Sequence, residues 1–400
     1  NEWLKICYYF TMILLASLTM GLFFVPYQAV IPDFAMTYNS RTRLVLGVRM
    51  FATFGTGTGS FVWMHLVDFF PLGDDDTTEA TAGMPYDYRK GYLWAAVTIA
   101  VPVFITSVVG ILAMRELPKE KEIESLEDQS LSKTKKRVRS LKKTLKMVFG
   151  LLTFPPFLIL LSMHILAAIA MALFSGNTVL YFKYVVGREE ATSAALLILQ
   201  ATLVTFMVIW MVAAIATKLK IIVFAVGNAI LVGSFAWMYF HDEDTELWVV
   251  MVNMAIIGSG SSAAGLMVNA MIPDVQELHF KKVHERQEAL FYGVFNFIET
   301  FAQGIAAMAA GYALEWAGYL NPAAQAAAGV TTQPDSAIAV MKWAVSFAPL
   351  ITAVLCFPMA LIYFFTVERK FKEGRRLAKL FGDGDGSNSD EESPLFADFS

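Results

Sequence analysis

Long apolar runs constrain the fold of this chain more than any other sequence feature. A hydrocarbon core of about 30 Å is crossed by a helix of roughly 20 apolar residues, and nine stretches reach that length. They are 5–31, 45–70, 91–114, 155–182, 192–216, 220–240, 247–272, 289–317 and 338–366. Only 16% of the residues are charged, against about a quarter in soluble domains, so a soluble core is excluded. We expect an all-α, multi-pass membrane protein with about nine transmembrane helices.

Lysine and arginine cluster in alternate connections between these runs. With nine helices every basic connection falls on one side, which the positive-inside rule assigns to the cytoplasm. The basic connections contain Arg41 and Arg43, eleven basic residues within 115–150, Lys218 and Lys220, Lys281, Lys282 and Arg286, and the stretch 369–379. This pattern predicts that residue 1 is outside and that the long loop and the C-terminus are cytoplasmic. The membrane is the plasma membrane or that of an internal organelle.

The long basic loop divides the chain unequally. We expect a partial N-terminal transmembrane half in 1–114 and a cytoplasmic linker with an amphipathic segment in 115–154. A six-helix half follows in 155–367, and 368–400 is a tail that is first basic and then acidic and disordered. The chain thus has three helices before the linker and six after it, whereas a transporter built from two six-helix halves has twelve. We therefore expect the first three helices to be missing, as in a fragment or a truncated gene model.

Charge and cysteine usage exclude other classes of protein. The net charge is −4, and no domain is basic enough to indicate a nucleic-acid partner. Cys7 and Cys356 both lie in apolar runs, where we expect burial rather than a disulfide or a metal site. No nucleophile–base pair or metal-ligand set recurs at helical spacing inside the runs. We expect no enzyme and no cofactor, but a monomer whose partners are the lipid bilayer and a small-molecule solute.

Charged and polar residues inside the apolar runs are candidates for a transport cavity, because lipid does not solvate them. Arg49 enters the second run, and its guanidinium can hold an anionic or polyhydroxyl group with two hydrogen bonds. The alternative is an arginine that snorkels to the membrane edge. Pro26 either only kinks the first helix or frees carbonyls that line a cavity, which Tyr27 and Gln28 would then face. Asn177 is a further solute-binding candidate.

A polar stripe marks the run 289–317. Asn296, Glu299 and Gln303 are spaced i, i+3 and i+7, so on a helix they share one face. That face is predicted to point into the bundle, with Asn296 and Gln303 binding solute and Glu299 coupling a cation. The alternative is a structural glutamate that bonds across helices. His164 is alone in another run, and it is expected to be a hydrogen-bonded interior histidine, with a proton relay as the alternative.

Two further patterns concern the closure of the inner face and the packing of the helices. Asp274, Glu277, Arg286 and Glu288 fall in a predicted cytoplasmic loop. They are expected to form a charge network that gates the inner face, or else a solvated loop. Small residues are expected to let helices approach closely; these are Gly55, Gly57 and Gly59, and Gly258, Gly260, Ser261, Ser262 and Gly265.

Three groups of short motifs occur in order along the chain. They are VPYQA at 25–29 with IP at 31–32 and RMF at 49–51; YFKYVVG at 181–187; and MIPDV at 271–275 with RQEALFY at 286–292 and GY at 318–319. In order and spacing they resemble three regions of the glycoside–pentoside–hexuronide cation symporters. These regions are the passage from helix 4 to helix 5, the end of helix 7, and the region from helix 10 to helix 11.

This resemblance implies a major facilitator fold and cation-coupled symport of a small organic solute that is a sugar, a glycoside or lysolipid-like. In the family, the arginine at the place of Arg49 lines the solute and cation cavity. Phe24 stands where melibiose permease has an aspartate, and Thr300 stands where a lysine is common. Both departures argue against the usual sodium site, so of the two coupling cations, H⁺ and Na⁺, we expect H⁺, with Glu299 and Thr300 in the coupling role. The alternative is a non-transporting membrane sensor or scaffold with a transporter fold.

The predicted topology can be tested by labelling single cysteines. On a background with Cys7 and Cys356 replaced by serine, Thr77→Cys should react with an impermeant maleimide in intact cells, whereas Ser132→Cys should react only after permeabilisation. The reason is that loops of opposite charge bias lie on opposite sides of the membrane. Equal labelling of both cysteines in intact cells contradicts the topology.

Overall fold

A computed structural model describes Thr11, Leu15 and residues 38–67, 88–115, 144–217, 219–283, 287–321, 324–325, 329–330 and 332–369. Across these residues the regular secondary structure is helical throughout. The chain divides into two compact units, one formed by Asn1–Met50 with Met147–Ser400 and the other by Phe51–Lys146. The first run predicted to cross the membrane, 5–31, lies outside the described residues apart from Thr11 and Leu15.

The smaller unit contains the second part of α3 (Tyr38–Val67) and the whole of α4 (Tyr88–Arg115). Both helices coincide with predicted membrane runs. The side chains of Phe104, Val103 and Ile105 on α4 are more than half exposed, as expected of a helix whose apolar surface faces lipid. Residues 144–152 are also helical, in the segment predicted to be amphipathic; its place on a membrane surface stays a prediction.

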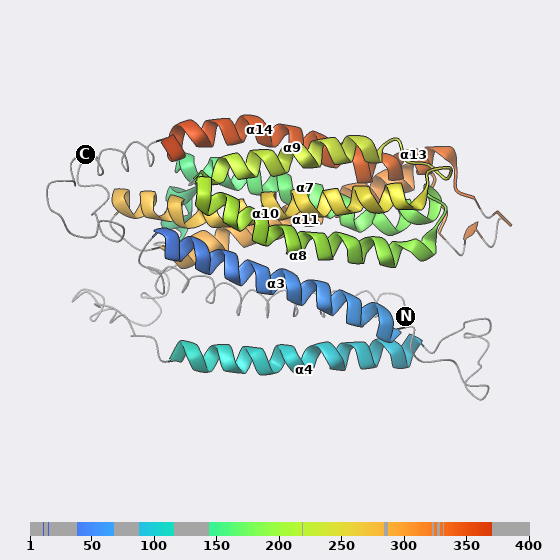
Figure 1. Cartoon of the computed structure of the whole chain (residues 1–400), viewed down its shortest axis with the longest axis horizontal. Helices are drawn as coiled ribbons and strands as arrows, with labels where there is room; N and C mark the ends of the chain where they lie inside the picture. The colour runs from blue at the N-terminus through green and yellow to red at the C-terminus, as the bar shows by residue number, and fades with distance from the viewer. Residues whose placement is uncertain are drawn as a thin grey trace. The chain divides into compact units, whose positions relative to one another are not determined.

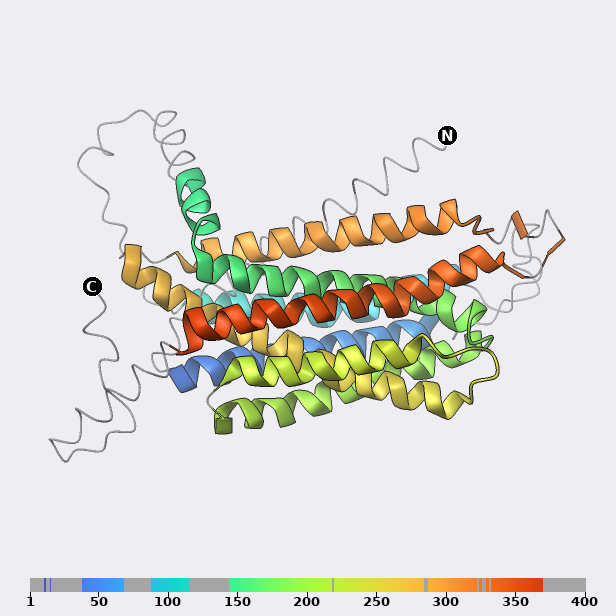
Figure 2. The ribbon, with the colours of Figure 1, turned by 90° about the horizontal axis from the view of Figure 1, so that it is seen from above.

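Six long helices form the bundle of the larger unit, and they run side by side in both ribbon views (Figures 1 and 2). They are α7 (Pro155–Tyr184), α8 (Thr192–Thr217), α9 (Lys220–Met238), α10 (Leu247–Val283), α11 (Glu288–Trp316), and a last helix that begins as α13 (Asp335–Lys342) and continues as α14 (Ala348–Tyr363). All six lie where the apolar runs predict them. α7 packs against α10, α11 and α14, and α10 packs against α8 and α9.

Six segments of the described chain are long and apolar enough to cross a membrane. They are Lys90–Gly110, Pro155–Tyr184, Glu189–Thr217, Lys220–Met238, Leu247–Val283 and Asp335–Glu368. α3 and α11 are helices but do not meet that criterion. In α11 the polar stripe with Glu299 lowers the hydropathy of the helix. The multi-pass character is therefore confirmed, whereas the count of nine membrane helices stays a prediction.

Prolines shape two of the bundle helices. Pro273 lies inside α10, yet the helix continues for ten residues to Val283, so the boundary expected at residue 272 is wrong. Proline removes one backbone hydrogen bond, and packing holds the helix on both sides, since Val275 and His279 beyond the proline are buried. In the last helix, a π-helical segment, Trp343–Phe347, precedes Pro349. A proline that donates no hydrogen bond favours such a local change of register.

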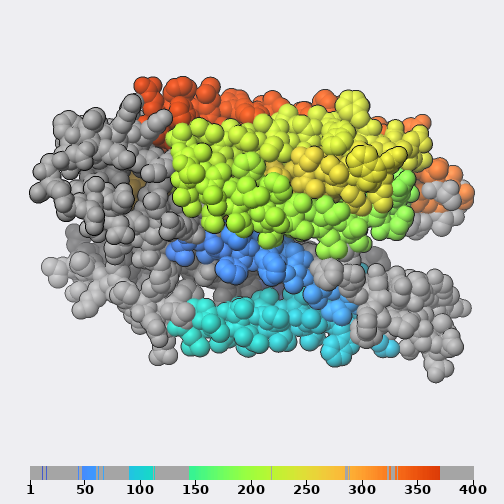
Figure 3. All heavy atoms as spheres, in the orientation of Figure 1, coloured from blue at the N-terminus to red at the C-terminus, as the bar shows by residue number. Residues whose placement is uncertain are grey.

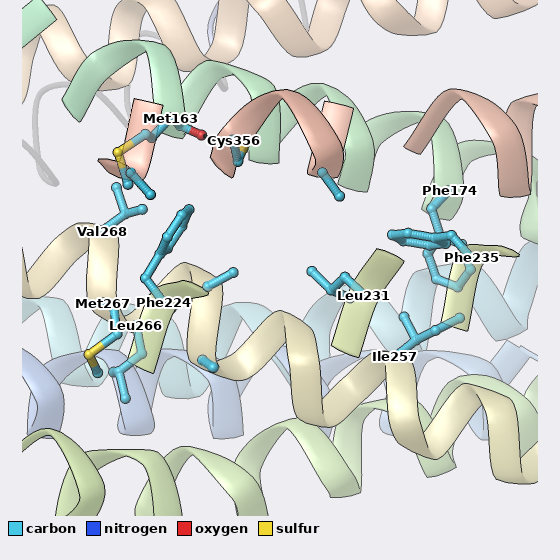
Figure 4. Packing of buried hydrophobic residues seen from close by; sticks show 14 of the residues in the cluster. Met163, Phe174, Phe224, Leu231, Phe235, Ile257, Leu266, Met267, Val268 and Cys356 are labelled. Atoms are coloured by element: carbon cyan, nitrogen blue, oxygen red, sulfur yellow. Dashed lines mark hydrogen bonds between the residues drawn. The ribbon is translucent and has the colours of Figure 1, made fainter. Parts of the chain in front are cut away.

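The core of the bundle includes apolar side chains from all six helices, and Figure 4 shows the part contributed by α7, α9, α10 and α14. Phe174 of α7 and Phe235 of α9 meet edge to face, with ring centroids 5.7 Å apart. Cys356 of α14 is buried and lies 3.8 Å from the carbonyl oxygen of Met163. The predicted burial of Cys356 is thus confirmed; Cys7 lies outside the described residues.

α10 approaches α8 and α9 closely because glycines lie at the contacts. A Cβ atom on Gly258 would lie 2.6 Å from the carbonyl oxygen of Leu199 on α8. A Cβ atom on Gly227 of α9 would lie 2.3 Å from that of Ala263. The three helices together cover one face of the bundle (Figure 3). The expected close approach is therefore confirmed at Gly258 and also holds at Gly260, where a Cβ atom would lie 2.9 Å from the Gly227 carbonyl oxygen.

The same expectation is not supported at three other glycines. A Cβ atom on Gly55, Gly59 or Gly265 would have none of the described neighbouring atoms within 4 Å.

The motif 181–187 ends α7 with a tight turn. Gly187 has a φ of 70°, a conformation that costs glycine little because it has no Cβ atom. The Arg188 amide donates to the Phe182 carbonyl at 2.9 Å. The Tyr181 hydroxyl donates to the Met238 carbonyl at 2.8 Å, which ties this end of α7 to the end of α9.

The glycine contacts predict that an added methyl group lowers stability where the glycine touches a neighbouring helix and has little effect elsewhere. Gly258→Ala should lower the free energy of unfolding by about 1–3 kcal/mol, because the new methyl group overlaps α8 backbone. Gly233→Ala on α9 is the matched control, because a Cβ atom there meets none of the described neighbouring atoms within 4 Å, and alanine favours a helix. Thermal unfolding in detergent measures both variants, and equal melting temperatures contradict the close contact.

Candidate functional site

Arg49 and Asn269 meet inside the larger unit. The Asn269 amide nitrogen donates to the Gly265 carbonyl within α10 at 2.7 Å, which fixes the orientation of the amide. Its oxygen accepts a hydrogen bond from the Arg49 guanidinium on α3. Arg49 also lies within electrostatic range of Glu299 and Tyr292. The guanidinium therefore points at the polar face of the bundle, which argues against the alternative of an arginine that snorkels to the membrane edge.

Glu299 of α11 is paired with His164 of α7. The His164 Nε2 atom lies 2.8 Å from the Glu299 Oε2 atom. The other carboxylate oxygen accepts a hydrogen bond from the Gln303 amide at 3.3 Å, so these two residues share a face as their spacing predicts. The His164 ring stacks on Phe295 with ring centroids 4.3 Å apart. An ionised or polar group in this apolar setting is stabilised only by such partners.

The remaining predicted site residues lie apart from this pair or outside the described residues. Asn177 is buried, and its amide donates to the Leu173 carbonyl in its own helix at 2.8 Å. Thr300 is exposed and donates to the Asn296 carbonyl at 2.9 Å, so it does not face Glu299. Asn296 is half-buried on the polar side of α11. Tyr27 and Gln28 lie outside the described residues.

A second charged cluster lies at the end of the bundle that is predicted to be cytoplasmic. Lys220 begins α9, and its Nζ atom lies 2.9 Å from the Asp274 Oδ2 atom of α10. The ammonium group also donates to the Ala270 carbonyl at 2.7 Å. Both side chains are nearly buried, with 4% and 13% of their surface exposed. Glu368, in the π-helical segment Phe364–Glu368, accepts from the Ile221 amide at 3.3 Å.

This cluster joins the ends of three helices. Glu368 caps the first turn of α9 from the last helix, where the carboxylate interacts favourably with the helix dipole. Lys220 joins α9 to α10. All three groups belong to one bundle, so these contacts hold the ends of its helices together.

Asp274 and Glu277 lie within α10 rather than in the loop that the sequence predicted. The helix continues past Pro273 because its next turns are buried. The gating network stays a prediction, because Arg286 and the side chain of Glu288 lie outside the described residues.

A sequence profile described as "MFS/sugar transport protein" matches residues 3–369. The chain belongs to this family. Members of the major facilitator superfamily are transporters, which agrees with the expectation that this protein is not an enzyme. The bundle of α7 to α14 has the six helices expected in 155–367, and its assignment as one half of a transporter stays a prediction.

Curated relatives of this major facilitator protein include symporters. The chain is 27% identical over 318 residues to "Sodium-dependent lysophosphatidylcholine symporter 1-A" of Danio rerio, covering 78% of this chain and 53% of that protein. It is 25% identical over 310 residues to the human symporter 1, covering 76% and 52%. An uncharacterized symporter of Synechocystis is 27% identical over 224 residues, covering 53% and 38%. The chain thus spans about half the length of the two lysophosphatidylcholine symporters.

Four residues of these clusters were not among the predicted site residues. His164 was predicted to be an interior histidine, with a proton relay as the alternative, and Lys220 was noted only as a positive charge in a loop. Asn269 and Glu368 had no assigned role. A signal existed for Asn269, since an amide inside an apolar run needs a partner. For Glu368 no local signal existed, because its partner Ile221 lies 147 residues away.

The buried Lys220–Asp274 pair predicts a large loss of stability when one partner is replaced, and recovery when both are replaced. Lys220→Met should destabilise the protein by about 3–5 kcal/mol, because Asp274 loses its buried partner. The double variant Lys220→Met with Asp274→Leu should recover most of that loss. Lys183→Met is the control, because the Lys183–Glu189 pair spans 2.8 Å but is exposed, and such pairs contribute at most about 1 kcal/mol. The melting temperatures of the variants in detergent test this prediction. A double variant that is no more stable than Lys220→Met contradicts a pairing role.

Proposed function

We propose that this protein is a cation-coupled symporter of a small organic solute that carries an anionic group. The contact between Arg49 and Asn269, within electrostatic range of the Glu299–His164 pair, carries the proposal. These residues supply a positive charge and a carboxylate within electrostatic range of each other. In a transporter these are the two elements that symport needs, namely a group that holds the solute and a group that responds to a cation.

The chemistry of Arg49 favours a solute with a phosphate or carboxylate group. Its planar guanidinium can donate two parallel hydrogen bonds to such an anion, and Asn269 engages part of the fork. The names of two curated relatives specify lysophosphatidylcholine, whose phosphodiester has this chemistry. A lysophospholipid is therefore the first solute to test, and a sugar or glycoside is the second.

The inner cluster supports alternating access in this proposal. Transporters of this architecture expose their site to each side in turn by rocking one half against the other. Lys220, Asp274 and Glu368 bind the ends of α9, α10 and the last helix together, so the half can move as one body. We place this cluster at the cytoplasmic side, in line with the basic residues around it.

Substitution of Arg49 tests the proposal. In cells that express the complete coding sequence, Arg49→Gln should reduce uptake of radiolabelled lysophosphatidylcholine by about 10- to 100-fold. The basis is that hydrogen bonds to charged groups contribute about 1.5–3 kcal/mol. Arg49→Lys should recover only part of the activity, because an ammonium lacks the planar fork. Lys90→Gln, at an exposed position of α4, is the matched control and should transport normally.

Two outcomes contradict the proposal. Unchanged uptake by Arg49→Gln removes Arg49 from the solute site. Absence of uptake of lysophosphatidylcholine and of a set of glycosides by the wild-type protein, at normal surface expression, contradicts symport of these solutes and supports the alternative of a sensor or scaffold.

A further inference from the structure

The atoms around Glu299 discriminate between coupling cations. Its Oε2 atom lies 2.8 Å from a nitrogen of His164, and its Oε1 atom accepts from the amide nitrogen of Gln303. Hard metal cations are held by several oxygen ligands. Both carboxylate oxygens face nitrogen donors, which is an arrangement suited to exchange of a proton.

His164 is placed to carry that proton. Imidazole is the side chain whose ordinary titration falls between about pH 5 and pH 8. The side chain of His164 is 10% exposed, whereas that of Glu299 is 28% exposed, so the carboxylate is the more accessible member of the pair. Phe295 covers one face of the imidazole ring. Stacking on Phe295 and the contact with Glu299 together fix the orientation of the ring.

The other titratable and charged groups near the pair come from three helices. α3 contributes Arg49 and α11 contributes Tyr292. α14 contributes Cys356, 3.8 Å from the carbonyl of Met163, the residue before His164. α10 contributes the neutral Asn269 at this level. The positive charge of Arg49 thus opposes the addition of a proton to the Glu299–His164 pair.

We propose that the coupling ion is a proton, that His164 carries it in a pair with Glu299, and that an anionic solute on Arg49 promotes its uptake. The inference rests on the proposed function and names its cation. A proton from one aqueous side passes by way of Glu299 to neutral His164, giving an imidazolium–carboxylate pair, and is released to the other side after the solute leaves. A bound anion neutralises Arg49 and removes the repulsion that opposes this proton. Binding of either ligand therefore strengthens binding of the other, as linkage requires.

The test compares net accumulation with exchange in proteoliposomes that contain the complete protein and radiolabelled lysophosphatidylcholine. In sodium-free buffer with the membrane potential held at zero, an inward proton gradient of one pH unit should drive accumulation of about tenfold at most, the ratio stored in that gradient for one proton per solute. His164→Gln keeps a side chain that can contact Glu299 but does not titrate. It should lose this accumulation and retain solute exchange at equal pH. If His164 had only a structural role, the variant would keep or lose both activities together.

His279→Gln is the matched control, because His279 is also buried and packs its ring against Phe154 and Phe291. It should keep proton-driven accumulation. The wild-type protein supplies a measurement that needs no variant. Net uptake should fall as the external pH rises from about 5.5 to about 8, while exchange at saturating solute changes little.

The outcomes separate the two proposals. Accumulation by His164→Gln equal to the wild type, or wild-type accumulation driven only by a sodium gradient, overturns the proton assignment and leaves symport standing. A wild-type protein that neither accumulates nor exchanges the solute overturns the proposed function, and the proton assignment with it.

Discussion

Every charge inside the bundle must find its partner within the protein, because lipid offers none. This constraint explains both charged clusters of the larger unit. Lys220 is held by Asp274 and a backbone carbonyl, and Glu299 is held by His164 and Gln303. Removing one partner would leave the other buried without compensation, which is far more costly than replacing the pair by apolar side chains. The pairs therefore add specific polar contacts between helices that otherwise pack together only through apolar side chains.

α10 connects the two clusters. Asn269 and Asp274 lie five residues apart on it, one turned to Arg49 and the other to Lys220. Its glycines bring it against α8 and α9, and Pro273 lies between its two polar residues. In the proposed symporter, α10 moving as a rigid element would transmit a change at Asn269 to Asp274.

The apolar runs predicted the helices well because length and composition suffice to define a membrane helix. All six helices of the larger bundle lie within a few residues of the predicted runs, except that α10 extends to Val283. That extension was missed because a proline and the charges of Asp274 and Glu277 resemble a loop in a one-dimensional pattern. Burial of Val275 and His279 keeps the helix intact beyond Pro273. The polar stripe of α11 was also predicted, since helical spacing alone places Glu299 and Gln303 on one face.

The sequence by itself determined that this chain is helical and crosses the membrane several times, and that Arg49 and Glu299 need polar surroundings there. These are properties of single segments, set by hydropathy and by the cost of an unsolvated charge. Only the tertiary structure decided which partner each charge has. Glu299 lies against His164, 135 residues away in the chain, and Arg49 contacts Asn269, 220 residues away. Such pairs depend on how helices pack and rotate against one another, and no local pattern in the sequence contains that information.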